Sequence, residues 1–276
     1  MGRNNWTDEK LFSRLMNNKS QRTYWDNIAA LRKRPNREVF DKSILLMQSE
    51  NARFREIGIN VSAQLGIPPR PFYNETLKLY FDLLSGENEP AVLSTLLYAI
   101  GHNNDKLTHS QIQTLVSFKD FRDSFVREAL VNALLGVEDA IAIYTLLYLS
   151  EDTAASVRNW ATFGIGTLVD SDNEMIRAAL WKRVSDRNID TKFEAIAGLA
   201  KRKDIRIKDI IEKELLSGDY QSLLFDAITD LGDIHFLPIL KSQLVSNEQN
   251  KNVNNEWLKS LKNCITSLEN RTPNSK

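Results

Sequence analysis

The chain has 276 residues, of which 42% are apolar, and its 36 Lys and Arg residues balance 36 Asp and Glu residues. Such a composition is typical of a soluble folded protein, and the length allows two ordinary domains or one long repeat array. Proteins that bind a phosphate backbone usually carry a basic excess, so the balanced charge disfavours nucleic acid as the main partner.

The first residues, "MGRNNWTDEKLF", contain no apolar segment of the kind that forms a secretory signal. No apolar run approaches the ~18 residues that a membrane-spanning helix needs. Cys264 is the single cysteine, so an internal disulfide or a paired-cysteine metal site is excluded. We therefore expect a cytoplasmic protein that does not enter a membrane.

A serine that follows two or three apolar residues recurs along the chain at intervals of 29 to 36 residues. These serines are Ser49, Ser85, Ser117, Ser150, Ser185, Ser217 and Ser246. Turn-forming residues follow each of them, and then a new segment with helical apolar spacing begins. Each serine is therefore predicted to mark a turn between two helices.

The segments after these turns share a second repeat, anchored mostly by a basic residue. The anchors are Arg22, Arg55, Pro90, Arg127, Arg158, Lys192, Gln221 and Asn255. Apolar or small residues stand three and six positions beyond each anchor, which places both on one helix face. Strand signals are almost absent, so the pattern predicts an all-α solenoid of about eight helix pairs.

The predicted solenoid forms one domain over residues 1–270, with residues 1–40 and 246–270 as capping repeats and residues 271–276 as a disordered tail. The fold class implies a right-handed superhelix. We expect a monomer.

The stretch "SVRNWATFGIGTL", residues 156–168, places Gly164 and Gly166 inside an expected helix. Each glycine in a helix interior lowers stability by about 1 kcal/mol relative to alanine. In the middle repeats the facing positions are small: Ala161, Gly164, Ala195 and Gly198. Small side chains let adjacent helices approach closely, so tight packing is expected to offset the unfavourable glycines.

No catalytic motif is present, because the chain lacks HExxH, GxSxG, a P-loop and any Cys/His cluster. The acidic stretch from Asp170 to Asn173 resembles a calcium loop but lacks its glycine and its later glutamate. It is better interpreted as the start of a helix. We therefore expect no enzymatic activity, no cofactor and no metal.

The pairs Val126-Arg127 and Val157-Arg158, with the triplet Leu231-Gly232-Asp233, resemble bacterial HEAT-repeat proteins of the phycobilisome-lyase-like HEAT group. The resemblance covers roughly residues 40–245 and implies HEAT-like helix pairs. The bilin chemistry of the lyases has no counterpart in the residues of this chain.

The stretch "VRNWATF", followed by "EAIAGLAKRKD", resembles small enterobacterial HEAT-repeat proteins encoded beside Rhs-type polymorphic toxins. That resemblance implies a non-enzymatic immunity protein, which neutralises a cognate toxin by binding it. A basic toxin domain is the expected partner. Two alternatives stay open: a general HEAT scaffold or adaptor for another protein complex, and a nucleic-acid-binding or alkylpurine-glycosylase-like HEAT protein.

Two basic runs bear on the nucleic-acid alternative. They comprise Arg32, Lys33, Arg34 and Arg37, and Lys201, Arg202, Lys203 and Arg206. Each lies at the end of the second helix of a pair, where cations stabilise the helix dipole. We expect this structural role, with phosphate contact as the alternative.

In helical arrays of this kind the second helices usually line the concave binding surface. Residues one, two or five positions beyond the anchors are predicted to face it, together with Asp230. The predicted partner-binding residues are Glu56, Asn60, Glu128, Asn132, Asn159, Trp160, Phe163, Phe193, Glu194, Asp226 and Asp230. Aromatic side chains anchor protein interfaces, and carboxylates attract a basic partner. The alternative is that the three aromatic residues pack between adjacent helices.

Overall fold

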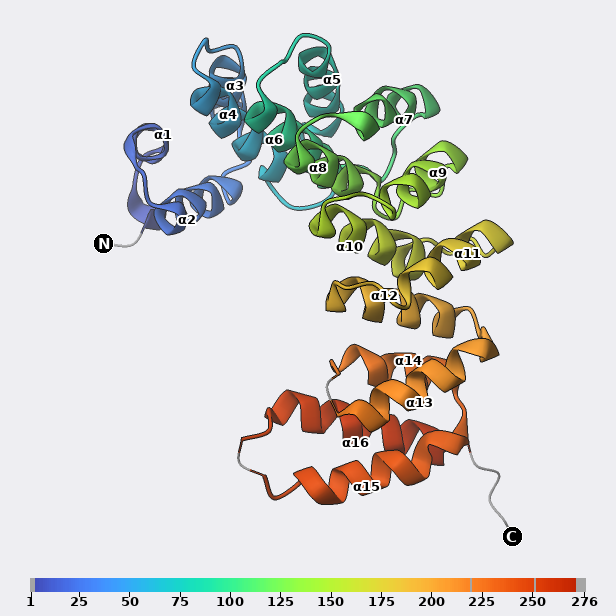
Figure 1. The fold of residues 1–276 in the computed structure, drawn as a ribbon. Coiled ribbons are helices and arrows are strands. Elements are labelled where there is room, and N and C mark those ends of the chain that lie inside the picture. The colour runs from blue at the N-terminus through green and yellow to red at the C-terminus, as the bar shows by residue number, and fades with distance from the viewer. Residues whose placement is uncertain (1–2, 219, 251, 272–276) are drawn as a thin grey trace. The chain divides into compact units, whose positions relative to one another are not determined.

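The computed structural model describes residues 3–218, 220–250 and 252–271, and within these ranges the secondary structure is helical throughout (Figure 1). The chain divides into two compact units, residues 1–145 and 146–276, which are described separately below. Residues 272–276, most of the predicted tail, lie outside the described residues.

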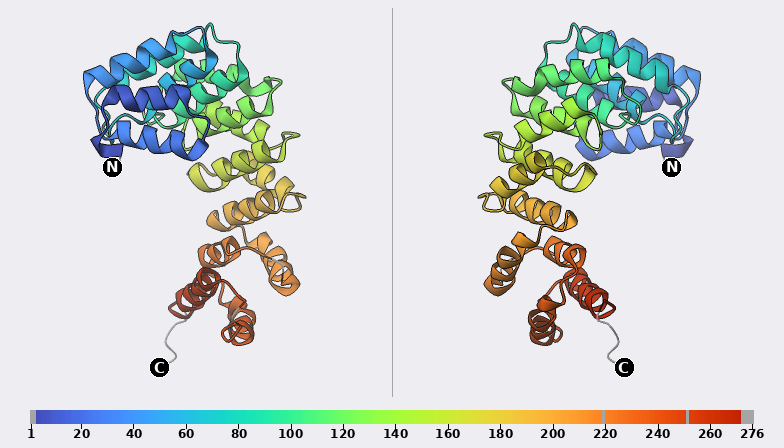
Figure 2. Two further views of the ribbon diagram at one scale, coloured as in Figure 1. Left: turned by 90° about the vertical axis from the view of Figure 1, so that its left-hand side faces the viewer. Right: turned by 90° about the vertical axis from the view of Figure 1, so that its right-hand side faces the viewer.

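The first unit is built from antiparallel helix pairs. Its helices are α1 (Asp8–Asn17), α2 (Gln21–Arg32), α3 (Arg37–Met47), α4 (Ala52–Gln64), α5 (Tyr73–Leu84), α6 (Pro90–Gly101), α7 (His109–Val116) and α8 (Ser124–Leu134), and α9 (Ala140–Leu149) contains the boundary between the units. Each odd-numbered helix up to α7 packs against the even-numbered helix after it. The even-numbered, second helices also pack on one another in the order α2, α4, α6, α8. Figure 2 shows the helices of this unit, in blue to green, from two further sides.

The second unit repeats this arrangement. Its helices are α10 (Ala155–Phe163), α11 (Glu174–Arg183), α12 (Ile189–Lys201), α13 (Lys208–Ser217), α14 (Leu223–Leu231), α15 (Leu237–Asn247) and α16 (Asn255–Glu269). The second helices α10, α12, α14 and α16 stack in sequence and supply most of the buried apolar residues. The prediction of about eight helix pairs in an all-α repeat fold is confirmed; the handedness and the capping repeats stay predictions.

The repeated serines close the first helix of a pair. The hydroxyls of Ser85, Ser117, Ser150 and Ser217 each donate to the carbonyl oxygen three residues earlier, at 2.7 Å. They satisfy carbonyls that a helix end leaves without a donor. Ser246 departs from the predicted pattern, because it lies inside the last turn of α15.

Asparagine, aspartate and threonine side chains begin the helices instead. The side chains of Asn51, Asp123 and Asn188 accept hydrogen bonds from backbone N–H groups at the starts of α4, α8 and α12. Asn173 does the same for α11, as the sequence predicts for the stretch that resembles a calcium loop. These oxygens satisfy N–H groups that the start of a helix leaves without an acceptor, and the hydroxyls of Thr7, Ser20 and Thr108 do the same at α1, α2 and α7.

The basic anchors tie neighbouring repeats together. Arg158 donates to the turn carbonyls of Asp152 and Thr153, at 2.8 and 3.1 Å, and holds the Asp186 carboxylate of the next turn with two bonds of 3.1 Å. Arg55 forms the same contacts with its own turn and with Glu87, at 2.7 and 3.1 Å. These bidentate pairs are largely shielded from solvent, which explains why arginine recurs at this position.

The glycines of residues 156–168 lie at a change of helix type. After α10 ends at Phe163, residues Gly164–Leu168 form a π-helical turn, η3, closed by a 3.0 Å bond from Val169 N–H to the Gly164 carbonyl. A Cβ placed on Gly198 of α12 would lie 2.6 Å from the Gly166 Cα. The two backbones therefore touch directly, and the predicted close approach of the helices is confirmed.

Gly198→Ala is expected to lower the free energy of unfolding by about 1–2 kcal/mol, because overpacking outweighs the gain of about 1 kcal/mol in helix propensity. Urea denaturation followed by circular dichroism measures this. The matched control is Gly86→Ala, where a Cβ would meet nothing within 4 Å. If the two variants are equally stable, the close contact of Gly198 with Gly166 does not require glycine at position 198.

Intramolecular contacts occupy most of the basic side chains singled out above. Arg202 is buried and donates to backbone carbonyls of η3 and of the residues after it. Lys201 donates to the Thr167 carbonyl at 2.7 Å, and Lys203 donates to the Asp230 carbonyl. Arg34 pairs with Asp8 in the first unit. These cations therefore serve the fold as expected, but through hydrogen bonds and ion pairs to other elements and not through the dipole of their own helix alone.

Candidate partner-binding surface

The predicted partner-binding residues all lie on second helices. Glu56 and Asn60 lie on α4, Glu128 and Asn132 on α8, Asn159, Trp160 and Phe163 on α10, Phe193 and Glu194 on α12, and Asp226 and Asp230 on α14. In the second unit, α12 packs against both α10 and α14. The structure therefore brings the residues of these three helices together on neighbouring elements.

Trp160 is the exposed aromatic residue of this group. Its side chain is 38% exposed, and its ring meets that of Phe163 edge to face, with centroids 5.8 Å apart. Phe163 is half-buried, so this ring contact anchors the indole to the fold. The amide oxygen of Asn159 is enclosed by protein, so this residue offers less to a partner than predicted.

The placement of Phe193 in an exposed patch is wrong. Its side chain is 1% exposed and belongs to the core of the second unit. Phe193 stands one position beyond its anchor Lys192, and the residues at that position in α4, α8 and α10 are half-buried polar residues. The position faces a neighbouring helix, so a large apolar side chain there is drawn inside whereas Glu56 or Glu128 extends its polar end outward.

Two groups of carboxylates have shifted pKa values. Those in the turns are paired with arginine or lysine, which holds the pKa of Asp172 and Asp233 below the usual value. Those on the second helices behave in the opposite way, because burial raises the pKa of Glu56, Glu194 and Asp226. The first group stabilises the fold. Glu194 and Asp226 are partly desolvated with no cation that offsets the effect of burial, whereas Arg53 and Arg55 offset part of it for Glu56.

Glu194 is the clearest member of the second group, with a pKa of about 7. Burial is the largest cause, Asp190 adds like charge, and the Thr167 hydroxyl offsets part of the effect. The pKa of Asp226 is raised by burial and by the negative charge of the neighbouring Asp230. A cation brought by a partner would relieve this repulsion and restore the ionised state.

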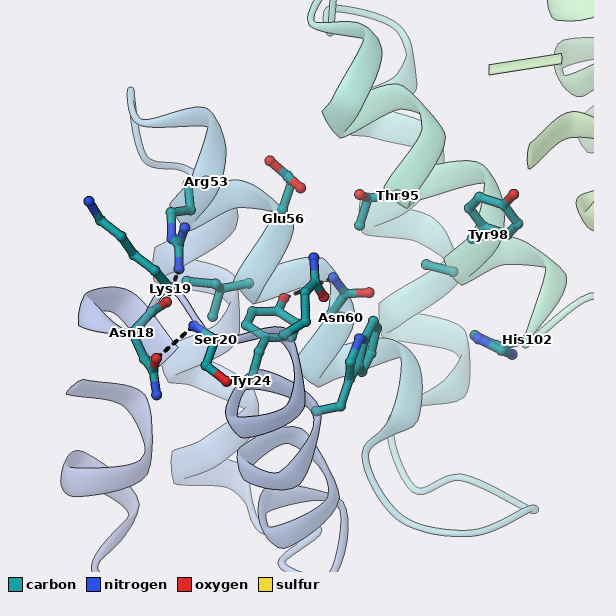
Figure 3. Close-up of a pocket in the computed structure, with 14 residues that line it drawn as sticks. Asn18, Lys19, Ser20, Tyr24, Arg53, Glu56, Asn60, Thr95, Tyr98 and His102 are labelled. Carbon is teal, nitrogen blue, oxygen red and sulfur yellow. Dashed lines mark hydrogen bonds between the residues drawn. The ribbon is translucent and has the colours of Figure 1, made fainter. Parts of the chain in front are cut away.

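The first unit contains a pocket of about 560 Å³ between α2, α4 and α6 (Figure 3). It is lined by Asn18, Lys19, Ser20, Gln21, Tyr24, Trp25, Arg53, Glu56, Ile57, Asn60, Thr95, Tyr98, Ala99 and His102. Asn60 donates to the Tyr24 hydroxyl at 2.9 Å, which fixes one wall. The Tyr98 hydroxyl donates to the Glu128 carboxylate at 2.9 Å. Glu128, one of the predicted partner-binding residues, is therefore partly engaged within the fold.

The aromatic residues of this pocket were missed by the sequence pattern. With Arg22 as anchor, Trp25 is expected to face the core, yet it is 46% exposed. Arg55, Arg127 and Arg158 each occupy the fourth position of their helices, and in α2 that position belongs to Tyr24. The register of the first repeat is therefore shifted by two residues, a shift that alignment on the helix start would have revealed.

No family model matches the chain. Over 126 residues the chain is 33% identical to protein YibA of Escherichia coli K12, and equally to YibA of Escherichia coli O157:H7. The chain resembles YibA. The match spans 46% of this chain and 45% of YibA, so the chain covers less than half the length of these relatives.

Structural similarity extends further than sequence similarity. The X-ray structure of Escherichia coli YibA has a TM-score of 0.70 at 23% identity, covering 95% of this chain and 93% of YibA. The crystal structure of an engineered protein has a TM-score of 0.54 at 15% identity, over 95% of this chain and 78% of that protein. At these identities the likeness to YibA and to the engineered protein establishes the repeat fold and nothing about function.

Residues capable of metal binding do not gather anywhere in the described ranges, where no group of three or more His, Cys, Asp or Glu side chains has a suitable arrangement. None of the helices among the described residues is long and apolar enough to cross a membrane. The second helices do offer the exposed indoles of Trp25 and Trp160, and the partly desolvated carboxylates of Glu194 and Asp226.

Proposed function

We propose that this chain is a non-enzymatic binding protein whose second helices take up a basic protein partner. The observation that carries the proposal is the combination on α10, α12 and α14 of an exposed indole, Trp160, with the uncompensated carboxylates of Glu194 and Asp226. Tryptophan is enriched among residues that dominate binding energy, and carboxylates of this kind favour a cationic surface.

The specific form of the proposal is an immunity protein that neutralises a polymorphic toxin of the Rhs type by binding it. This form rests on the resemblance of "VRNWATF" and "EAIAGLAKRKD" to the immunity proteins of such loci. A basic nuclease domain would complement an acidic surface. The general scaffold or adaptor remains the alternative, because it would use the same surface.

Nucleic-acid binding is less well supported. Phosphate contact requires several accessible Lys or Arg side chains on one surface. Arg202 is buried, whereas Lys201 and Lys203 donate to backbone carbonyls. Arg37 is paired with Asp41 and Glu75. The two basic runs therefore retain few side chains that are not already held within the fold.

The test is affinity capture from the native host followed by mass spectrometry. Wild-type protein is compared with a triple variant, Trp160→Ala/Glu194→Gln/Asp226→Asn. We expect the wild type to retain one stoichiometric basic toxin-like protein and the variant to lose at least about 100-fold in affinity, since single hot-spot residues contribute 2 kcal/mol or more. Co-expression with the captured toxin domain then measures protection of the host cell.

The matched control changes one aromatic residue, one glutamate and one aspartate that lie on first helices: Tyr144→Ala on α9, Glu174→Gln on α11 and Asp209→Asn on α13. All three are exposed, and they should leave capture unchanged. Capture that survives the triple variant would contradict the proposed surface. Capture of nucleic acid, or a toxin-like protein that gives no protection on co-expression, would contradict the immunity function.

A further inference from the structure

We propose that the pocket between α2, α4 and α6 binds an arginine side chain of the basic partner, with the guanidinium paired to Glu56 and stacked on Trp25. This inference rests on the proposed function and names what one of its sites recognises. The pocket, of about 560 Å³, holds an extended arginine side chain and the backbone next to it.

Glu56 supplies the charge. It lies on α4 and lines the pocket, and in the described part of the chain its carboxylate forms no ion pair of 4 Å or less (Figure 3). The two arginines that flank it are engaged elsewhere: Arg53 donates to the Asn18 carbonyl, and Arg55 holds Glu87. Burial raises the pKa of Glu56 and outweighs the lowering by Arg53 and Arg55, so the carboxylate is partly desolvated.

Trp25 supplies the flat surface. Its ring is 46% exposed and is set edge to face against Tyr24, with centroids 5.1 Å apart and planes at 88°. The bond from Asn60 to the Tyr24 hydroxyl in turn holds that ring. A guanidinium stacks flat on an indole, and it pairs with a carboxylate through two parallel N–H groups. An ammonium has no planar group and cannot make this paired contact.

Apart from Lys19 and Arg53, the other groups that line the pocket carry no positive charge at pH 7. His102 directly follows the last residue of α6, and burial together with Arg70 and Arg32 lowers its pKa, so its imidazole is neutral at pH 7. Tyr98 directs its hydroxyl to Glu128, which leaves a second carboxylate close to the pocket wall. Lys19 and Arg53 are exposed at one end, and their charge restricts where a guanidinium can sit without excluding it.

The test uses a small probe on the full chain. A blocked arginine, N-acetyl-arginine methylamide, is titrated into ¹⁵N-labelled protein at constant ionic strength, and the Trp25 indole N–H is followed by NMR. The neutral isostere, blocked citrulline, is titrated in parallel. We expect saturable shifts with arginine and none with citrulline. Glu56→Gln should weaken arginine binding by on the order of tenfold, the worth of a charge-assisted hydrogen bond.

Glu38→Gln, at an exposed carboxylate on α3, is the matched control and should bind as the wild type does. The spectrum of each variant verifies its fold. Equal shifts with citrulline, unchanged binding by Glu56→Gln, or no shift at Trp25 would each overturn the pocket.

Partner capture separates this inference from the proposed function. If arginine binds through Glu56 but no basic protein is captured, the pocket stands and the proposed function fails. If a basic toxin is captured equally well by wild type and Glu56→Gln, the proposed function stands and the pocket inference fails.

Discussion

Arg202→Leu is expected to lower the free energy of unfolding by about 3–5 kcal/mol, comparable to breaking a buried ion pair. The Arg202 side chain is only 4% exposed. Its guanidinium donates to the carbonyls of Gly166, Ile165 and Val169, at 2.6, 2.7 and 3.0 Å. Ile165 and Gly166 belong to the single turn η3 and Val169 follows it, so the chain supplies few further donors there and leucine would leave several buried carbonyls unsatisfied.

Urea denaturation of Arg202→Leu, read as the midpoint at unchanged slope, measures the loss. Arg202→Lys should be intermediate, because an ammonium keeps the charge but cannot reach all the carbonyls. Lys201→Leu is the control from the neighbouring exposed position and should change stability by less than about 1 kcal/mol. If Arg202→Leu is no less stable than Lys201→Leu, the carbonyls of η3 do not depend on the arginine.

Arg202 also illustrates how far the sequence could predict the structure. A cation at the end of a second helix is a local feature, so the position of Arg202 relative to α12 was predictable from the helix dipole. Its burial depends on the π-helical turn at Gly164–Leu168, some 36 residues earlier in the chain. The glycines indicated close packing there but gave no sign of a changed hydrogen-bonding pattern, so the main role of the arginine was not predictable.

The repeat pattern was predictable for a similar reason. Helix starts, helix ends and the three-residue apolar spacing are local, and eight repeats reinforce one another. Which side chains of a helix are exposed is harder to predict, because a shift in register of one or two residues moves a side chain from the exposed face to the buried face. Trp160 and Glu194 fall on accessible positions, but Phe193 is buried and Trp25 is exposed, each against expectation. The pocket requires three helices in contact, and no local pattern describes such a combination.

Glu194→Gln is expected to raise the free energy of unfolding at pH 8 by about 1–3 kcal/mol, since a pKa shift of one unit is 1.36 kcal/mol and partial exposure reduces the full effect. The pKa of Glu194 rises from 4.5 to about 7 in the folded protein. A raised pKa means that the folded state binds the proton more tightly. The associated stability is therefore present below pH 4.5 and is lost as the pH rises through 7.

Unfolding free energies at pH 5 and pH 8 test this directly, because the glutamine variant should lose less stability than the wild type between the two. Asp186→Asn provides a control of opposite sign. Arg158 holds the pKa of Asp186 below its usual value, against burial, so its removal should destabilise the protein at pH 8. No gain from Glu194→Gln at pH 8 would mean that the fold already satisfies this carboxylate.

The same variant separates stability from binding. If the Glu194 carboxylate serves a cationic partner, Glu194→Gln should weaken partner capture by about tenfold or more while the chain itself becomes more stable. A residue kept for folding cannot behave in this way, because its loss would lower both quantities together. A variant that is more stable and still binds fully would remove Glu194 from the surface and leave Trp160 and Asp226 as its main determinants.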